Sequence, residues 1–144
     1  PYTPAVNLVF ALDEALKMMK EEGLENIFLR HNRHQMAMSS AAKALNLKLF
    51  ADEKNLSPSI TAIKTEEMDA EEFRKTIKDK FDILLAGGQD HLKGKIFRVG
   101  HLGYVNNRDI ITVISAISST LLELGKITAQ QAGEALELAN KYLE

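Results

Sequence analysis

Residues 95–103, KIFRVGHLG, are the most informative stretch of this chain and predict a strand over 95–99. Because strand side chains alternate between the two faces of a sheet, Phe97 and Val99 share one face, while Ile96 and Arg98 share the other. We expect Arg98 to have a partner, since an unpaired charge in an apolar strand is costly. Two interpretations stay open. The partner is either a carboxylate of this chain, in an internal ion pair, or the carboxylate of a ligand, held by the guanidinium fork in two hydrogen bonds.

Three more strands and one helix are predicted upstream of this stretch. Runs of apolar and β-branched residues predict strands over 47–50, 60–64 and 83–86. A helix is predicted to begin after Asp69, which has Glu72 three residues later in a capping-box arrangement. If the strands on either side of this helix lie parallel in one sheet, the connection between them is expected to be right-handed.

Helices are predicted at both ends of the chain. The first begins near Pro4, with Thr3 as its N-cap, and the second covers 24–45. Two more helices follow the strand at 95–99, and the last of them begins at a capping box formed by Thr128 and Gln131.

The first helix is apolar on more than one side. Leu8, Leu12 and Leu16 form a stripe at helical spacing, whereas Val6 and Phe10 lie off that stripe. One domain core does not easily cover both sets, so we expect part of this helix to be buried against something beyond the domain.

The order of elements predicts the fold class. Two helices precede two strands, one helix lies between the second and third strands, and two helices follow the fourth. The economical arrangement is an α+β sandwich, in which a small mixed sheet of about four strands has helices packed on one face. A length of 144 residues fits one domain, 1–144. Since the chain begins at Pro1 rather than Met, we expect it to be a fragment.

Composition excludes several functional classes. A formal net charge of −2 argues against nucleic acid or an anionic membrane as a partner. Cysteine is absent, which excludes disulfides and thiolate metal sites and is compatible with a reducing, cytoplasmic compartment. No apolar run approaches the ~18–20 residues that span a bilayer, and no signal peptide is recognisable.

Two weaker candidate sites are a histidine pair and a glycine pair. His31 and His34 are three residues apart and would share a helix face. A solvated face or an interface explains them better than a metal, and we predict no metal site. Gly87 and Gly88 would bring backbone amides close to an anion, but a simple turn is the commoner role of such a pair.

The run IFRVGHLG at 96–103 resembles a signature of class V pyridoxal-phosphate aminotransferases, most closely the serine–pyruvate and alanine–glyoxylate branch. Further stretches of the chain are similar to the same family: Thr3–Val6, Arg30–His31, Ala44–Phe50, Ser57–Ala62 and Leu85–Gln89. The chain departs from the family's pattern at Asp90 and His91, which follow Gly-Gly-Gln where relatives often have glycine.

The resemblance implies that this chain is the C-terminal small domain of a fold-type I enzyme, with the large cofactor-binding domain missing. It implies a homodimer that uses pyridoxal 5'-phosphate to move an amino group from an amino acid to a 2-oxo acid such as pyruvate or glyoxylate. Arg98 would bind the substrate carboxylate, and Thr3 would contact the phosphate of the cofactor in the partner subunit.

The same resemblance implies that the catalytic lysine lies upstream. The chain would then contain no catalytic residue, would not bind the cofactor covalently and would be inactive alone. The alternative is a non-catalytic interaction or regulatory module, for example a hydrogenase-associated subunit, in which Arg98 forms a structural ion pair.

Overall fold

The computed structural model describes residues 3–66 and 68–144. Two compact units are distinguished, Pro1–Arg30 and His31–Glu144. The helices are α1 (Val6–Glu22), α2 (Leu24–Ala44), α3 (Ala70–Phe81), α4 (Asn107–Glu123) and α5 (Ala129–Leu143). The strands are β1 (Lys48–Leu49), β2 (Ile60–Lys64), β3 (Ala86–Gly87) and β4 (Ile96–Gly100), and the short 3-10 turns are η1 (Glu53–Asn55) and η2 (Asp90–Leu92).

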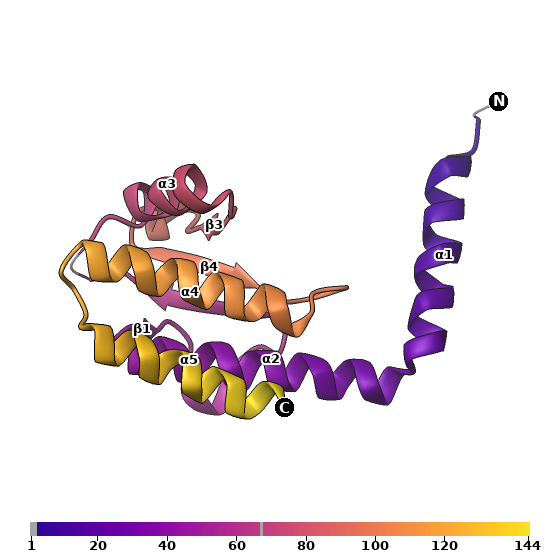
Figure 1. Cartoon of the computed structure of the whole chain (residues 1–144). Coiled ribbons are helices and arrows are strands. Elements are labelled where there is room, and N and C mark those ends of the chain that lie inside the picture. Colours follow the sequence, from indigo (N-terminus) through magenta and orange to yellow (C-terminus); the bar gives the residue numbers. More distant parts are fainter. Residues whose placement is uncertain (1–2, 67) are drawn as a thin grey trace. The chain divides into compact units, whose positions relative to one another are not determined.

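The four strands form one sheet in the order β1-β2-β4-β3 (Figure 1). Every pair of neighbours is antiparallel, so the prediction of a mixed sheet is wrong. Strands β2 and β3 do run in the same direction, since both are antiparallel to β4, but β4 lies between them. The connection through α3 therefore spans the central strand, and the stretch that contains Arg98 occupies the middle of the sheet.

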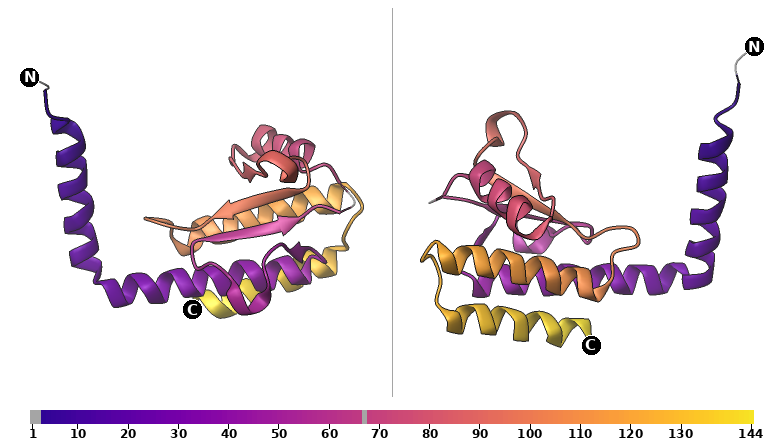
Figure 2. Two further views of the ribbon diagram at one scale, coloured as in Figure 1. Left: turned by 180° about the vertical axis from the view of Figure 1, so that it is seen from behind. Right: turned by 45° about the horizontal axis from the view of Figure 1, so that its top comes forward.

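Helices cover one face of this sheet, as predicted. Phe97 is fully buried in one hydrophobic cluster with residues of α2, α3, α4 and α5. Its ring lies 5.1 Å from that of Phe73 on α3, measured between centroids. Ile63 faces the same core across the β2–β4 pair. In the left view of Figure 2 the β2 and β4 arrows lie in front of α4, so this view shows the face that α4 leaves uncovered.

Two predicted helix starts are confirmed by their caps. Asp69 accepts hydrogen bonds from the backbone amides of Glu71 and Glu72 at the start of α3. Thr128 and Gln131 form the complete reciprocal box at the start of α5. Such side chains accept hydrogen bonds from amide groups that have no partner within the helix. Their positions can therefore be predicted from the sequence.

Other boundaries differ from the prediction. Strand β3 covers Ala86–Gly87 rather than 83–86, and the carbonyl of Leu85 accepts from Arg74 Nε at 2.8 Å. The N-cap of α1 is Ala5, without a side-chain hydrogen bond. Thr3 is therefore not the cap, since it lies two residues ahead of that position.

The unit that contains α1 buries none of that helix's residues. Leu8, Leu12 and Phe10 are all more than half exposed, so the leucine stripe is no better covered than the residues beside it. Both sets of apolar residues are therefore exposed in this unit. Within the unit, the Arg30 guanidinium pairs with the Glu22 carboxylate, with Nε and Oε1 2.6 Å apart. In the described residues, no helix has the length and apolar character needed to cross a membrane.

Candidate functional site

Arg98 stands on the face of β4 opposite the core. Its direct cross-strand neighbours are Ala62 on β2 and Ala86 on β3, and neighbours of this kind share a face of the sheet. The side chain is half-buried. Its Nε donates to the carbonyl oxygen of Gly87 at 3.0 Å, which fixes the plane of the guanidinium against the edge strand. The alternation of faces predicted from the sequence is confirmed.

The carboxylates that the structure describes leave Arg98 without an ion pair. In residues 3–66 and 68–144, the arginines that pair with a carboxylate are Arg30 and Arg74. The bond to Gly87 is the hydrogen bond observed for the Arg98 side chain in the same residues. An internal carboxylate partner, the first of the two interpretations of Arg98, is thus not found in this part of the chain. The two terminal nitrogens of Arg98 make no hydrogen bond within these same residues.

Arg74, on α3, is a second cation near β3, and sequence reasoning missed it. Its Nη1 pairs with Glu71 at 2.8 Å, and its Nε binds the carbonyl of Leu85. A Cβ atom at Gly87 would lie 2.4 Å from that Nη1, so a side chain there would push the end of Arg74 aside. The one signal in the sequence is the three-residue spacing of Glu71 and Arg74, which places both side chains on one helix face. Because Arg74 is already paired, its role is to support the β3 edge.

Gly88 is also explained by packing. A Cβ atom here would lie 2.0 Å from the carbonyl oxygen of Leu92, so any side chain would displace the turn that follows. Its amide donates to the carbonyl of Ile96 at 3.2 Å. Because the amide of Gly88 is already bonded within the sheet, the structure does not support an anion site at the glycine pair.

The histidines join elements rather than forming a metal centre. His34 is fully buried, with its Nε2 3.0 Å from Oδ1 of Asn107, the first residue of α4. His31 accepts a hydrogen bond from the amide of Gly103 at 3.2 Å. No group of three or more side chains arranged to hold a metal is found within the described ranges.

His101, three residues after Arg98, is fully buried and was missed as a structural residue. Its Nε2 lies 2.9 Å from the hydroxyl of Thr61, and its amide donates to the carbonyl of Ser59. Burial, and secondarily the nearby His34, lower the pKa of His101 to about 4. The imidazole is therefore neutral near pH 7 and anchors the end of β4 to the start of β2.

Thr3, the other residue that the family pattern singled out, is exposed. It belongs to the unit Pro1–Arg30, whereas Arg98 belongs to the unit His31–Glu144. Since Ala5 is the N-cap of α1, the hydroxyl of Thr3 is not used as a helix cap.

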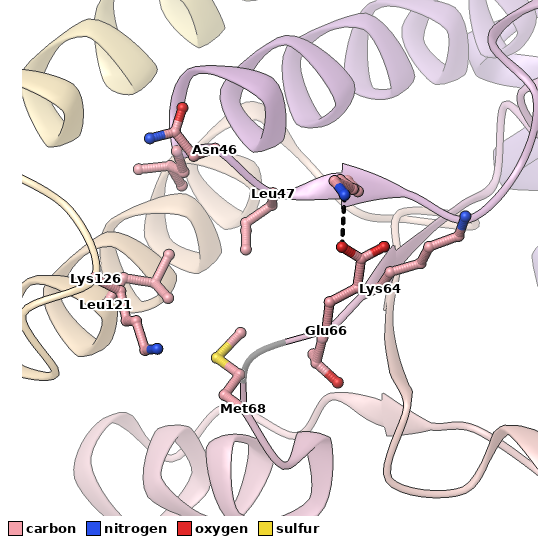
Figure 3. Close-up of a pocket in the computed structure, with 10 residues that line it drawn as sticks. Asn46, Leu47, Lys64, Glu66, Met68, Leu121 and Lys126 are labelled. Atoms are coloured by element: carbon pink, nitrogen blue, oxygen red, sulfur yellow. Dashed lines mark hydrogen bonds and ion pairs between the residues drawn. The ribbon is translucent and has the colours of Figure 1, made fainter.

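A cavity of about 330 Å³ opens elsewhere in the second unit, between β1, β2 and the end of α4. Leu47 and Met68 point toward each other across it, and the Lys48–Glu66 ion pair closes one side (Figure 3). Arg98 does not line this cavity. The candidate site is thus the open sheet face around Arg98.

The chain was compared with known proteins and family models. No family model matches it. It is 57% identical over 125 residues to the soluble hydrogenase 42 kDa subunit of Anabaena cylindrica. This match covers 87% of this chain and 33% of that protein. It is 32% identical to the serine–glyoxylate aminotransferase of Arabidopsis thaliana, over all of this chain and 36% of that protein.

Among solved structures, the ureidoglycine–glyoxylate aminotransferase of Bacillus subtilis superposes with a TM-score of 0.89 at 32% identity. That match covers 98% of this chain and 36% of the other. The chain therefore spans about a third of the length of the relatives that it matches.

Proposed function

Because this chain corresponds to the C-terminal part of the class V aminotransferases, we propose that it is the small domain of a pyridoxal-phosphate-dependent transaminase. The whole enzyme would move an amino group from an amino acid to a 2-oxo acid such as pyruvate or glyoxylate. Within that enzyme, this domain would bind and orient the substrate carboxylate and would help to close the active site. Relatives named as glyoxylate aminotransferases support the proposal.

One observation carries the proposal: Arg98 has no carboxylate partner among the described residues. Its Nε is held by the Gly87 carbonyl, and among the described residues Nη1 and Nη2 have no hydrogen-bond partner. An arginine that is half-buried between Ala62 and Ala86 is costly unless a ligand supplies the charge. A planar carboxylate matches that fork in geometry and in charge.

The cofactor would provide the electron sink for the reaction, and most of its contacts would come from residues outside this chain. Thr3 is the residue here that fits a phosphate contact. Thr3 is exposed, and its hydroxyl does not cap α1, because the N-cap of that helix is Ala5. We propose that Thr3 donates to the cofactor phosphate in the partner subunit of a homodimer. The cofactor lysine would lie outside this chain.

The proposed role of Arg98 is tested in the full-length enzyme by Arg98→Lys. An ammonium does not reproduce the fork, so we expect kcat/KM for amino acids to fall about 10- to 150-fold, the loss of one charge-assisted contact. An amine substrate without a carboxylate should react equally with wild type and variant. Arg108→Lys, at an exposed arginine on α4, is the matched control and should change neither rate.

Two outcomes would contradict this role. If Arg98→Lys lowers the rates with the amino acid and with the amine in proportion, Arg98 does not bind the substrate carboxylate. If instead the apo-protein loses much of its stability, Arg98 has a structural role.

A non-catalytic module is the second candidate, and the similarity to a soluble hydrogenase subunit favours it. In that case the same fold would serve an interaction surface, and purified full-length protein would lack transaminase activity with every amino acid and 2-oxo acid tested. Amino-group transfer from alanine or serine to glyoxylate, measured with and without added pyridoxal phosphate, distinguishes the two.

A further inference from the structure

Gly87 lies between an ion pair on one face of the sheet and Arg98 on the other. It is paired with Phe97 in the β3–β4 register, so a side chain here would point to the face that carries the core. On that face, a Cβ atom would lie 2.4 Å from Nη1 of Arg74 and 2.7 Å from Oε1 of Glu71. From the other face, the Nε of Arg98 donates to the carbonyl of Gly87. One backbone segment therefore contacts both guanidinium groups.

Arg74 projects from a helix that is anchored in the core. Phe73, its neighbour on α3, packs against Phe97 with ring centroids 5.1 Å apart. Ile77, one turn later, is fully buried. The Arg74 side chain is itself only 21% exposed, and its Nη1 lies 2.8 Å from the Glu71 carboxylate. The position of this guanidinium is therefore set by the helix and by the ion pair.

Strand β3 depends on this anchor. It has two residues, and it lies beside α3 at the edge of the four-stranded sheet (Figure 1). A short edge strand has few backbone hydrogen bonds to hold it, so side chains contribute much to its position. The Nε of Arg74 supplies such a bond to the carbonyl of Leu85, at 2.8 Å. The carbonyl of Gly87, two residues later, is thus placed by Arg74 as well as by the pairing with β4.

We propose that Arg74, supported by Glu71, is a positioning residue for the substrate carboxylate. It holds β3 in place, and the Gly87 carbonyl on β3 in turn orients the guanidinium of Arg98. A guanidinium binds a carboxylate through two parallel hydrogen bonds, so its orientation decides the strength of the contact. The proposal rests on the proposed function, because it requires that Arg98 binds a substrate carboxylate.

The variant Arg74→Met in the full-length enzyme tests this role. Methionine keeps an apolar stem and a high helix propensity, but it cannot donate to Leu85 or to Glu71. A misplacement of about 1 Å costs on the order of 100-fold in rate, so partial loosening of β3 should lower kcat/KM for amino acids about tenfold. The loss should lie mainly in KM, because the carboxylate is bound in the ground state as well as in the transition state. An amine without a carboxylate should react with unchanged kcat/KM.

Lys75→Met is the matched control. Lys75 is the next residue of α3, pairs with Asp79 of the same helix and has a side chain that is 76% exposed. This variant removes a cation and an ion pair from α3 without breaking a bond to β3, so both substrates should react as with wild type. Unchanged kcat/KM for amino acids in Arg74→Met, proportional losses for amino acid and amine, or the same losses in Lys75→Met would overturn the proposal.

Gly87→Ala tests the same contact from the side of the strand. The backbone of Gly87 lies outside the left-handed region, so alanine can adopt it, but the new methyl group would push the end of Arg74 aside. We expect a selective loss for amino acids similar to that of Arg74→Met. The double variant should lose little more than either single variant, because all three break one contact. Losses that multiply in the double variant would show that the two residues act independently, against the proposal.

The Arg98→Lys result separates failure of this inference from failure of the proposed function. If that variant loses activity with amino acids alone, but Arg74→Met and Gly87→Ala do not, the positioning role is wrong and the carboxylate role stands. If Arg98→Lys leaves kcat/KM for amino acids unchanged, the proposed function fails and the positioning role fails with it.

Discussion

At the scale of single residues, His101 links a local pKa to the stability of the domain. Its pKa in the folded chain is about 4, below the ordinary value of 6.5, so the folded state disfavours the charged imidazole. The unfolded chain takes up this proton first as the pH falls. The contribution of His101 to the free energy of unfolding is therefore complete above pH 6.5 and is lost progressively down to about pH 4. The loss should be on the order of 2–3 kcal/mol.

The variant His101→Gln tests this link, because glutamine can still bond to Thr61 and does not titrate. The free energy of unfolding, measured by urea denaturation from pH 7.5 to pH 4, should depend less steeply on pH in the variant than in the wild type. His91→Gln, at an exposed histidine of η2, is the control and should retain the wild-type slope. Parallel curves for His101→Gln and wild type would contradict the assignment.

At the scale of elements, two glycines predict opposite effects of the same substitution. A methyl group at Gly88 would collide with the backbone of Leu92, so Gly88→Ala should destabilise the chain by about 1–3 kcal/mol. Gly133 lies inside α5 with open space at its Cβ position, so Gly133→Ala should stabilise by about 0.5–1 kcal/mol. The melting temperatures of both variants test this pair of predictions. If Gly133→Ala also destabilises the chain, the space assigned beside Gly133 on α5 is not open.

Helix α1 predicts how the isolated chain behaves in solution. Its apolar residues Leu8, Phe10 and Leu12 are all strongly exposed, and such surfaces usually mark interfaces. We expect the chain to self-associate or to bind an apolar dye, as seen by analytical ultracentrifugation and by dye fluorescence. The double variant Leu8→Lys with Leu12→Lys should reduce both signals. A monomeric wild-type chain without dye binding would contradict the expectation.

At the scale of the whole molecule, the chain spans about a third of its relatives and contains no stretch that resembles the cofactor-lysine motif. Several of its lysines are exposed and ion-paired, such as Lys17 with Asp13 and Lys75 with Asp79. We therefore predict that borohydride reduction of the chain with pyridoxal phosphate, followed by peptide mapping, will show only scattered, substoichiometric labelling. Full labelling of one lysine would place the catalytic residue inside this chain.

Local pattern was sufficient for the features of this protein that depend on near neighbours along the chain. The caps at Asp69 and Thr128, and the two faces of β4, follow from hydrogen bonds and side-chain alternation over a few residues. The helical layer on one face of the sheet also followed from the order of elements. The family resemblance that singled out Arg98 came from the same short stretch.

Contacts between distant segments decided the rest. The pairing of β4 between β2 and β3 made the sheet antiparallel, a choice that depends on which strands meet and not on any one strand's composition. The carbonyl of Leu85 is held by Arg74 of α3, 11 positions earlier in the chain. His101 became a buried anchor only because β2 supplies Thr61 beside it. Hydrogen bonds of this kind join residues 11 to 40 positions apart, and pairing over such distances is set by the packing of the whole domain.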